Sequence, residues 1–320
     1  MRRALHASRT RARVSFTGMD VFYTHHFVLP LPDGHRFPMA KYARLYERVA
    51  AQAEALGVSL HEPEAASIAD LERAHEADYV ARVVAGELTP RELGRIGFPW
   101  SPGMVERSRR SSGATVAALR SAIRERGFAV NLAGGTHHAH RDRGGGYCVF
   151  NDAVVAARHA QALGLARRVL VIDLDVHHGD GTASICADDP SIYTFSMHGA
   201  RNYPSVKPAG DLDVPLPDGC GDDEYLSLLR MHLPLAIARS GADAAIYLAG
   251  ADPYVGDRLG HLALSKAGLA ERDRRVLSQC LTAGLPAAIA MAGGYAEQID
   301  DIVDIHEATV RTAAQLIAGR

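Results

Sequence analysis

The chain has 320 residues, of which 47% are hydrophobic and 22% charged, and its formal net charge is −2. This composition is typical of a globular protein with enough apolar surface for a core, and the near-neutral balance gives no general attraction to nucleic acid or anionic membranes. No apolar run approaches the roughly 18 residues that a membrane-spanning helix needs. We therefore expect no direct nucleic-acid partner and no membrane partner.

The first 18 residues contain five arginines and no acidic residue. Organelle transit peptides have a similar composition, but the apolar face of this segment is poorly developed, which favours a disordered basic extension over residues 1–18. Residues 19–320 are expected to form one domain, because no linker and no solenoid repeat interrupts them. The four cysteines have no paired spacing, which favours reduced thiols and a cytoplasmic location.

Segments with helical character alternate with short apolar runs along the chain. The helical segments are residues 38–56, 67–85, 102–126, 151–163, 222–239, 265–283 and 296–317. A first strand is expected at Met19, and the later apolar runs are residues 128–132, 168–172, 191–195, 244–251 and 287–294. This alternation predicts an α/β fold with a single-domain, mainly parallel sheet flanked by helices on both faces.

The most informative stretch runs from Asp173 to Gly181 and has the sequence Asp-Leu-Asp-Val-His-His-Gly-Asp-Gly. It follows the apolar run at 168–172. On a continuing strand, Asp173, Asp175 and His177 would share one face. Two carboxylates and an imidazole beside apolar backbone are costly to desolvate unless a cation or hydrogen bonds compensate. A mixed Asp and His set suits zinc with one position left open for water, so we predict a metal site here. A polar strand end that only caps a helix is the alternative.

Polar side chains also follow the other apolar runs. They are Asp252, Tyr295, the pair His137 and His138, and the pair Ser196 and His198. In open α/β sheets the ligand crevice lies outside the carboxyl ends of the strands. Any one of these residues alone would be weak evidence, but together they predict one site at this edge, with Asp252 as a third metal ligand.

With these residues assembled, the chain resembles the zinc-dependent histone deacetylase family of the arginase–deacetylase superfamily. The resemblance rests on residues 134–139, 144–148, 173–181, 250–252, 256–260 and 293–295. The Gly-Gly-Gly-Tyr-Cys run at 144–148 and the Gly-Asp-Asp-Glu-Tyr run at 221–225 are most similar to class IV and its bacterial relatives. The resemblance covers residues 19–320 and implies that they form a deacetylase-like catalytic domain with the arginase–deacetylase fold.

The resemblance also implies a role for each metal-site residue. Asp175, His177 and Asp252 would bind one zinc ion per chain, although iron is an alternative metal. Two carboxylates and one imidazole formally cancel the zinc charge, so this zinc would be a weaker Lewis acid than an all-histidine site provides. Tyr295 would compensate by donating its phenol to the substrate carbonyl.

Two histidines would move protons, as the resemblance implies. His138 would be the general base that deprotonates water and later protonates the leaving amine. His137 would be its neighbour and contribute positive charge or a hydrogen bond. Asp180 and Asp173 would be their carboxylate partners, because a buried carboxylate fixes the tautomer of an imidazole and raises its basicity.

A structural potassium ion is implied near the same strand end. Asp173 and the Ser196 hydroxyl would bind it, and backbone carbonyls, including that of Met197, would complete the shell. His178 is expected to point to the opposite face from His177 and to be structural.

Substrate binding is expected in a narrow slot. Tyr147 and Tyr203 would form its aromatic walls beside Gly146, at positions where the family usually has phenylalanine, and Leu259 would line the floor. Small residues beyond the metal predict tolerance for acyl chains longer than acetyl. These are Gly134, Gly135, Ala249, Gly250, Gly293 and Gly294.

The predicted function is a zinc-dependent hydrolase that removes acetyl or longer acyl groups from lysine side chains of proteins. Acetylpolyamines or other small acyl-amines are alternative substrates. A non-catalytic protein that binds acyl-lysine is an alternative function. A binuclear manganese enzyme is disfavoured, because Gly179 and Tyr254 stand where bridging carboxylates would be needed. A nucleic-acid binder is disfavoured as well, because the arginines of the 102–126 helix are best explained as a solvated face. The oligomeric state stays open.

Overall fold

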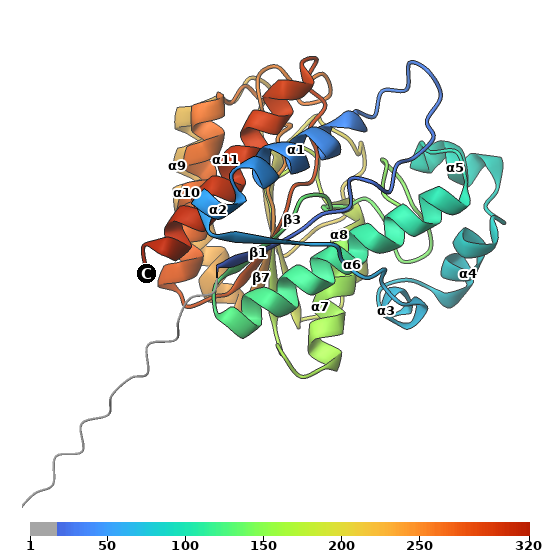
Figure 1. The fold of residues 1–320 in the computed structure, drawn as a ribbon, viewed down its shortest axis with the longest axis horizontal. Helices are drawn as coiled ribbons and strands as arrows, with labels where there is room; N and C mark the ends of the chain where they lie inside the picture. The colour runs from blue at the N-terminus through green and yellow to red at the C-terminus, as the bar shows by residue number, and fades with distance from the viewer. Residues whose placement is uncertain (1–17) are drawn as a thin grey trace, which may run out of the picture.

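A computed structural model of the chain describes residues 18–320. The predicted basic extension therefore lies outside the described residues, except for Gly18. The described chain has three layers, with one sheet between two sets of helices (Figure 1). This arrangement confirms the predicted single α/β sheet flanked by helices. Among residues 18–320, no helix combines the length and the apolar character needed to cross a membrane.

All strands of the described sheet are parallel to their neighbours. Their order across the sheet is β2-β1-β3-β8-β7-β4-β5-β6. The strands are β1 (Met19–Phe22), β2 (Val58–His61), β3 (Phe128–Asn131), β4 (Val169–Asp173), β5 (Ile192–Gly199), β6 (Leu212–Leu216), β7 (Ala244–Leu248) and β8 (Ala287–Ala290). The helices are α1 (Ala40–Ala51), α2 (Ala53–Leu56), α3 (Ile68–Glu72), α4 (Ala77–Ala85), α5 (Pro90–Ile96), α6 (Pro102–Glu125), α7 (Asp152–Ala162), α8 (Asp180–Cys186), α9 (Asp222–Ser240), α10 (Lys266–Thr282) and α11 (Ile299–Ala318).

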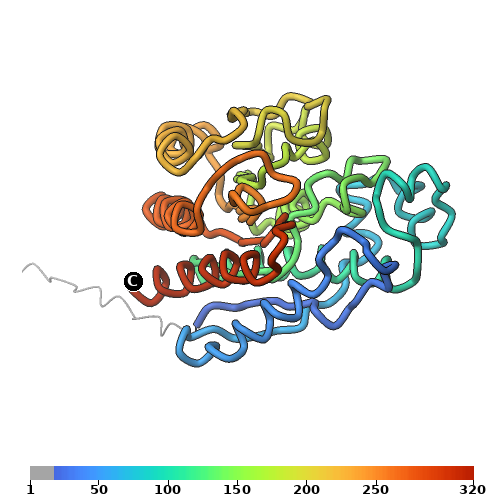
Figure 2. The backbone as a smooth tube through the Cα atoms, turned by 90° about the horizontal axis from the view of Figure 1, so that it is seen from above, coloured from blue at the N-terminus to red at the C-terminus, as the bar shows by residue number. Residues whose placement is uncertain are grey.

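Apolar side chains on both faces of the sheet hold the three layers together. On β4, Leu170 and Ile172 join the cluster that α1, α9, α10 and α11 complete, whereas Val169 and Val171 join the cluster that contains α4, α6 and α7. Figure 2 shows α11 lying beside α1 on the first of these faces. A strand that is buried on both faces has a continuous apolar sequence, and this explains why the central strands were recognisable.

Caps fix where the long helices begin. The Ser101 hydroxyl accepts a hydrogen bond from the backbone N–H of Met104, and Pro102 occupies the first turn of α6. Ser265 caps α10 in the same way through the N–H of Gly268. Each cap satisfies one of the N–H groups that have no partner inside the helix.

The predicted helix at residues 67–85 is wrong in one respect, because the chain breaks it into α3 and α4. Between them, the buried His75 ring accepts a hydrogen bond from Asn151 N at Nε2 (2.9 Å) and donates from Nδ1 to His140 O (2.8 Å). Burial lowers the pKa of His75 to about 4, so the ring stays neutral and can do both. His75 therefore connects the segment between α3 and α4 to the residues on both sides of the loop 141–150.

Four short elements were not predicted: β2, β6, α5 and α8. Strands β2 and β6 are the two edges of the sheet, and only Val214 and Leu216 of β6 are buried. Pro215 in β6 is compatible with an edge strand but weakens its sequence pattern. Helix α5 has a capping box between Thr89 and Glu92, yet it is too short for its apolar spacing to be informative.

A buried charged pair on α10 holds two of the strand-end loops together. Arg272 is fully buried, and its Nη1 donates to the carbonyls of Gly250 (2.7 Å) and Leu174 (3.3 Å). Its Nε donates to Asp273 (2.8 Å), which also accepts a hydrogen bond from the Tyr247 hydroxyl (2.5 Å). Each carbonyl stands one or two residues before a predicted metal ligand, so the pair fixes the backbone from which those ligands project.

Replacing Arg272 with methionine should destabilise the fold strongly. The change leaves the Asp273 carboxylate and two carbonyls buried without their partner, and breaking a buried pair costs about 3–5 kcal/mol. Denaturant unfolding measures this loss. Arg274→Met is the matched control on the same helix: its exposed ion pair with Glu271 should change stability by only about 0–1 kcal/mol. An Arg272→Met loss no larger than that of the control would contradict the structural role.

Candidate active site

The predicted metal ligands lie on loops after two adjacent central strands, β4 and β7. The expectation that Asp173, Asp175 and His177 share one strand is wrong in detail, because β4 ends at Asp173 and the chain then bends. Alternation nevertheless continues through the bend: Leu174 and Val176 enter the apolar core, while Asp175 and His177 face the opposite way. The burial of Leu174 and Val176, rather than a continuing strand, therefore orients the side chains of Asp175 and His177.

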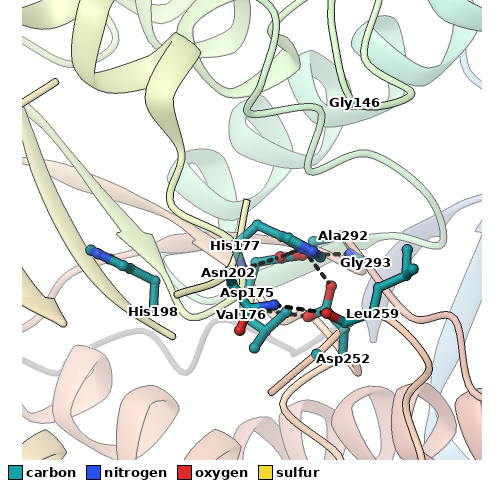
Figure 3. A network of polar contacts seen from close by, with 12 residues as sticks. Gly146, Asp175, Val176, His177, His198, Asn202, Asp252, Leu259, Ala292 and Gly293 are labelled. Carbon is teal, nitrogen blue, oxygen red and sulfur yellow. Dashed lines mark hydrogen bonds and ion pairs between the residues drawn. The ribbon is translucent and has the colours of Figure 1, made fainter. Parts of the chain in front are cut away.

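Asp175, His177 and Asp252 converge to form a compact buried donor set (Figure 3). His177 Nδ1 lies 2.9 Å from Asp175 Oδ1 and 3.2 Å from Asp252 Oδ2. The backbone N–H groups of Val176 and Gly293 donate to the other carboxylate oxygens of Asp252 and Asp175, at 2.9 and 2.8 Å. These bonds orient the carboxylates toward a common point.

The charges of this donor set fit a metal cation. Burial, and then repulsion from Asp175, raises the pKa of Asp252 to about 7. Burial alone would lower the pKa of His177, but the neighbouring carboxylates of Asp175 and Asp252 raise it to about 10. Asp252 Oδ2 is buried and has no hydrogen-bond partner, although it lies 3.2 Å from His177 Nδ1. Two dry carboxylates and an orphaned oxygen are the environment that a divalent cation compensates.

Two histidines from the loop after β3 face this donor set, each with a buried carboxylate. His137 Nδ1 lies 2.7 Å from Asp173 Oδ2, and His138 Nδ1 lies 2.6 Å from Asp180 Oδ1. The second oxygen of Asp180 is 3.0 Å from His140 Nε2, a partner that the motif analysis did not identify. His140 could have been suspected only from its place two residues after the histidine pair.

The two neighbouring imidazoles have opposite proton affinities. Burial, and then the charge of His137, lowers the pKa of His138 to about 3, although Asp180 opposes this. Burial also lowers the pKa of His137, but Asp173 and Asp175 outweigh it and raise this pKa to about 9. His138 is thus the neutral ring that can accept a proton, and His137 is the cationic one.

Tyr295 reaches the site from the loop after β8. Its ring centroid is 6.4 Å from that of His177. Burial raises the pKa of its phenol, so the hydroxyl remains a proton donor. Its backbone is held by Asp257, whose carboxylate accepts a hydrogen bond from Tyr295 N (2.6 Å), and by Arg258, whose Nε donates to Tyr295 O (2.9 Å). The Gly-Asp-Arg-Leu-Gly motif was visible in the sequence, but its function as a clamp on Tyr295 was not.

A cavity of about 400 Å³ leads to these residues. Its walls include all four predicted substrate-binding residues: Gly146, Tyr147, Tyr203 and Leu259. The Tyr203 ring is 47% exposed and lies edge-on to the His138 ring, with centroids 4.8 Å apart. A Cβ at Gly146 would lie only 2.5 Å from a ring carbon of His138, so the close approach of this wall requires glycine.

A buried lysine in this cavity was missed by sequence reasoning. Lys41 on α1 donates to the carbonyl of Gly294 (3.2 Å), and its ammonium lies 5.3 Å from the ring centroids of Tyr42 and Tyr295. Backbone carbonyls and aromatic faces both stabilise a cation. No motif marked Lys41, because α1 belongs to a segment far from the strand ends in sequence.

The residues predicted to bind potassium lie on neighbouring strands. Asp173 and Ser196 are register partners of β4 and β5, and the Ser196 hydroxyl is 2.9 Å from His198 Nδ1. His198 stands apart from the metal donor set (Figure 3) and instead forms a group with His178 and Asp213. His178 therefore does face away from His177, and its Nε2 lies 3.3 Å from Asp213. The Met197 side chain is buried in the core.

Comparisons with known proteins identify the family. A family model described as a histone deacetylase domain matches residues 35–311. The chain belongs to the histone deacetylase family of hydrolases. It is 31% identical to histone deacetylase 2 of Arabidopsis thaliana over 271 residues, covering 82% of this chain and 70% of that protein. It is 45% identical over 296 residues to an uncharacterized protein of Picosynechococcus sp., covering 92% of this chain and 98% of that protein.

A solved structure shows the same fold. The crystal structure of the HDA15 HD domain superimposes with a TM-score of 0.79 at 22% identity, covering 93% of this chain and 89% of that one. Shorter similarity extends to the acetoin utilization protein AcuC of Bacillus subtilis, which is 32% identical over 221 residues, or 62% of this chain and 57% of that protein.

The structure bears on two of the readings disfavoured above. Within residues 18–320, the two possible ligand groups share no residue, so no carboxylate bridges two ions. The expected solvated face is confirmed for Arg120 and Arg124, which are exposed. It is wrong for two others: Arg107 is buried against the Tyr42 ring at 4.3 Å, and Arg110 lies over the Phe27 ring at 4.7 Å. These side chains pack within the protein.

Replacing Asp252 with asparagine should weaken metal binding by more than the roughly 10–100-fold that changes beyond the direct ligands cause. The substitution removes a charged donor and leaves a buried amide in its place. Metal analysis after zinc loading and dialysis measures the stoichiometry, which we expect to be one ion per chain in the unaltered protein. Asp213→Asn, in the separate group with His178 and His198, is the control and should retain that ion. Loss of zinc from Asp213→Asn but not from Asp252→Asn would show that the metal binds to the group of His178, His198 and Asp213 instead.

Proposed function

We propose that this protein is a zinc-dependent hydrolase that removes acetyl or longer acyl groups from the side-chain amine of lysine residues in proteins. The observation that carries the proposal is the convergence of three kinds of group on one cavity. A three-residue donor set lies at its base, two carboxylate-bound histidines face that set, and a protonated tyrosine completes the site. Amide hydrolysis needs these groups: an electrophile, a base that becomes an acid, and an oxyanion donor.

Zinc bound by Asp175, His177 and Asp252 would supply Lewis-acid chemistry, and the remaining steps belong to the side chains of the protein. Because Nδ1 of His138 is bonded to Asp180, its Nε2 is free to take a proton from water. The same nitrogen then returns the proton to the departing lysine amine. The carboxylate keeps the ring in the required tautomer throughout.

Tyr295 and His137 would stabilise the charge that develops on the substrate. The Tyr295 phenol donates a hydrogen bond to the carbonyl oxygen as it becomes an oxyanion, and the cationic His137 lowers the energy of negative charge nearby. The Tyr147 and Tyr203 rings would hold the methylenes of the lysine stem, at about 0.8 kcal/mol for each methylene buried. With both catalytic histidines and the tyrosine in place, hydrolysis explains the site better than acyl-lysine reading alone.

Two further assignments belong to the proposal. Potassium would be held by Asp173, by the Ser196 hydroxyl and by the backbone at Met197, where it would stabilise the end of β4. We also place the protein in the cytoplasm, since its four cysteines are buried and free.

Replacing Tyr295 with phenylalanine should lower kcat by roughly 10²–10³, the usual effect of removing one oxyanion donor. Zinc content should not change, because Tyr295 is not among the predicted ligands. His138→Ala should be at least as damaging, since it removes both proton transfers. Steady-state kinetics on an acetyl-lysine peptide, with metal analysis of each variant, tests the two roles. Near-normal activity of His138→Ala beside an inactive His137→Ala would reverse the assignment of the base.

The structure does not support the argument that small residues beyond the metal make room for long acyl chains. Of the six small residues, only Gly134, Gly135 and Gly293 line the cavity. A Cβ at Gly134 would meet Asn131 (2.7 Å), and one at Gly293 would collide with Asp252, so these glycines permit close packing and do not create space. Tolerance for longer chains now depends on the cavity volume of about 400 Å³ and on the class IV resemblance.

Zinc-loaded protein should therefore hydrolyse lysine peptides that carry butyryl and octanoyl groups as well as acetyl. A panel of acyl-lysine peptides and free acyl-amines, compared by kcat/KM, measures this preference. A steady decline from acetyl through butyryl to octanoyl would show that the cavity does not accept long chains, and that plain deacetylation is the activity.

A further inference from the structure

The charged side chains that line the active-site cavity are unequally distributed. Its only carboxylate is Asp175, which belongs to the metal donor set at the base. Two permanent cations also line it: the buried Lys41, and Arg95 in the last turn of α5. His261 also lines it, but its ring lies 3.6 Å from Asp218. Among residues 18–320, no acidic side chain other than Asp175 lines this cavity beside Lys41 and Arg95.

Backbone hydrogen bonds join the end of α5 to the catalytic wall. The N–H of Gly146 donates to the carbonyl of Arg95 (3.1 Å), and the N–H of Tyr147 donates to the carbonyl of Ile96 (2.8 Å). Gly97 ends α5 in the left-handed conformation, with a φ of 83°, and so reverses the direction of the chain. Arg95 is thus anchored to the same segment whose Gly146 contacts the base histidine.

The glycine before that segment locates the Arg95 side chain. A Cβ built at Gly145 would lie 3.5 Å from the Tyr203 hydroxyl and 3.6 Å from Arg95 Cγ. The stem of Arg95 and the exposed edge of Tyr203 therefore flank the same glycine, one residue from the glycine that touches His138. Arg95 and Tyr203 thus lie on the same wall of the cavity as Gly146.

Within residues 18–320, the guanidinium of Arg95 has no hydrogen-bond or ion-pair partner. Nearby arginines do: Arg82 pairs with Glu92 (2.7 Å), and Arg143 pairs with Asp142 (2.8 Å). Glu92 is one helical turn before Arg95, but Arg82 and Thr89 engage it. Across residues 18–320, the exposed Arg95 side chain forms neither an ion pair nor a hydrogen bond. An arginine fork is suited to a carboxylate, so the free partner is expected to come from the substrate.

We propose that Arg95 is a specificity-determining residue that binds the carboxylate of a substrate residue flanking the acylated lysine. This inference rests on the proposed lysine deacylase function and narrows its substrate class. The preferred substrate is an acyl-lysine with an aspartate or glutamate within one or two residues. Acylated polyamines are disfavoured, because their free ammonium groups would lie beside an unpaired arginine.

Two acyl-lysine peptides that differ only in their flanking residues test this proposal. One has aspartate on both sides of the acyl-lysine and the other has lysine, within the same alanine-rich sequence. One exposed ion pair is worth about 0.2–1 kcal/mol, so the acidic peptide should be favoured about 1.4- to fivefold in kcat/KM at low salt. The difference should appear mainly in KM and shrink as salt is added, because rim charges act on binding and are screened.

Charge reversal at Arg95 provides the decisive comparison. Arg95→Glu should favour the basic peptide, and Arg95→Gln should remove the preference for the acidic peptide. Arg91→Glu is the matched control: it changes the same charge on the same helix at an exposed position outside the cavity lining, and should keep the acidic preference. Thermal melting of each variant checks that folding is unchanged.

The possible results separate this inference from the proposed function. Equal kcat/KM for the two peptides, or an acidic preference that survives Arg95→Glu, would overturn the role of Arg95 while leaving lysine deacylation intact. Faster hydrolysis of N-acetylspermidine than of the acidic peptide would overturn the substrate class. Failure of the zinc-loaded protein to hydrolyse any acyl-lysine peptide would overturn the proposed function instead.

Discussion

The buried pair of Arg272 and Asp273 is the interaction on which the geometry of this site depends. Side chains on loops keep a fixed position only if the loop backbone is held in place. Here the guanidinium of Arg272 binds the carbonyls of both Leu174 and Gly250, which precede the predicted metal ligands. A neutral side chain of similar size would fill the space but would leave both carbonyls unsatisfied in an apolar layer. A buried charge is usually costly, and its retention is understandable where it connects two loops that must not drift apart.

The two adjacent histidines of the site each have their own carboxylate partner. Asp173 serves His137, and Asp180 serves His138. The surroundings then drive the two pKa values in opposite directions, to about 9 and about 3. Two chemically identical side chains, adjacent in sequence, thereby acquire opposite shifts in proton affinity. This division of roles is a property of the fold, since the isolated dipeptide would not distinguish them.

The sequence allowed the central strands, the long helices and the convergence of polar residues to be predicted, because parallel strands buried on both faces are continuously apolar and deliver their ends to one edge. Edge strands such as β6 carry little of that pattern. Lys41 and Arg272 could not be found either, because each binds backbone carbonyls of segments far from it in the chain. The break in the predicted helix at His75 also depends on distant contacts. The helical sequence pattern continues through this point, and the break is explained only by the hydrogen bonds of His75 to the backbone of His140 and Asn151.

The order of the central strands has a consequence for how the protein is made. Strands β3, β8, β7 and β4 are consecutive in the sheet, but β8 is the last strand in the chain and sits between β3 and β7. The two halves of the sheet therefore cannot join until β8 has been synthesised, and such long-range pairing makes folding slow. Gly293 and Tyr295 follow directly after that strand. A nascent chain that has not yet inserted β8 consequently lacks an assembled site.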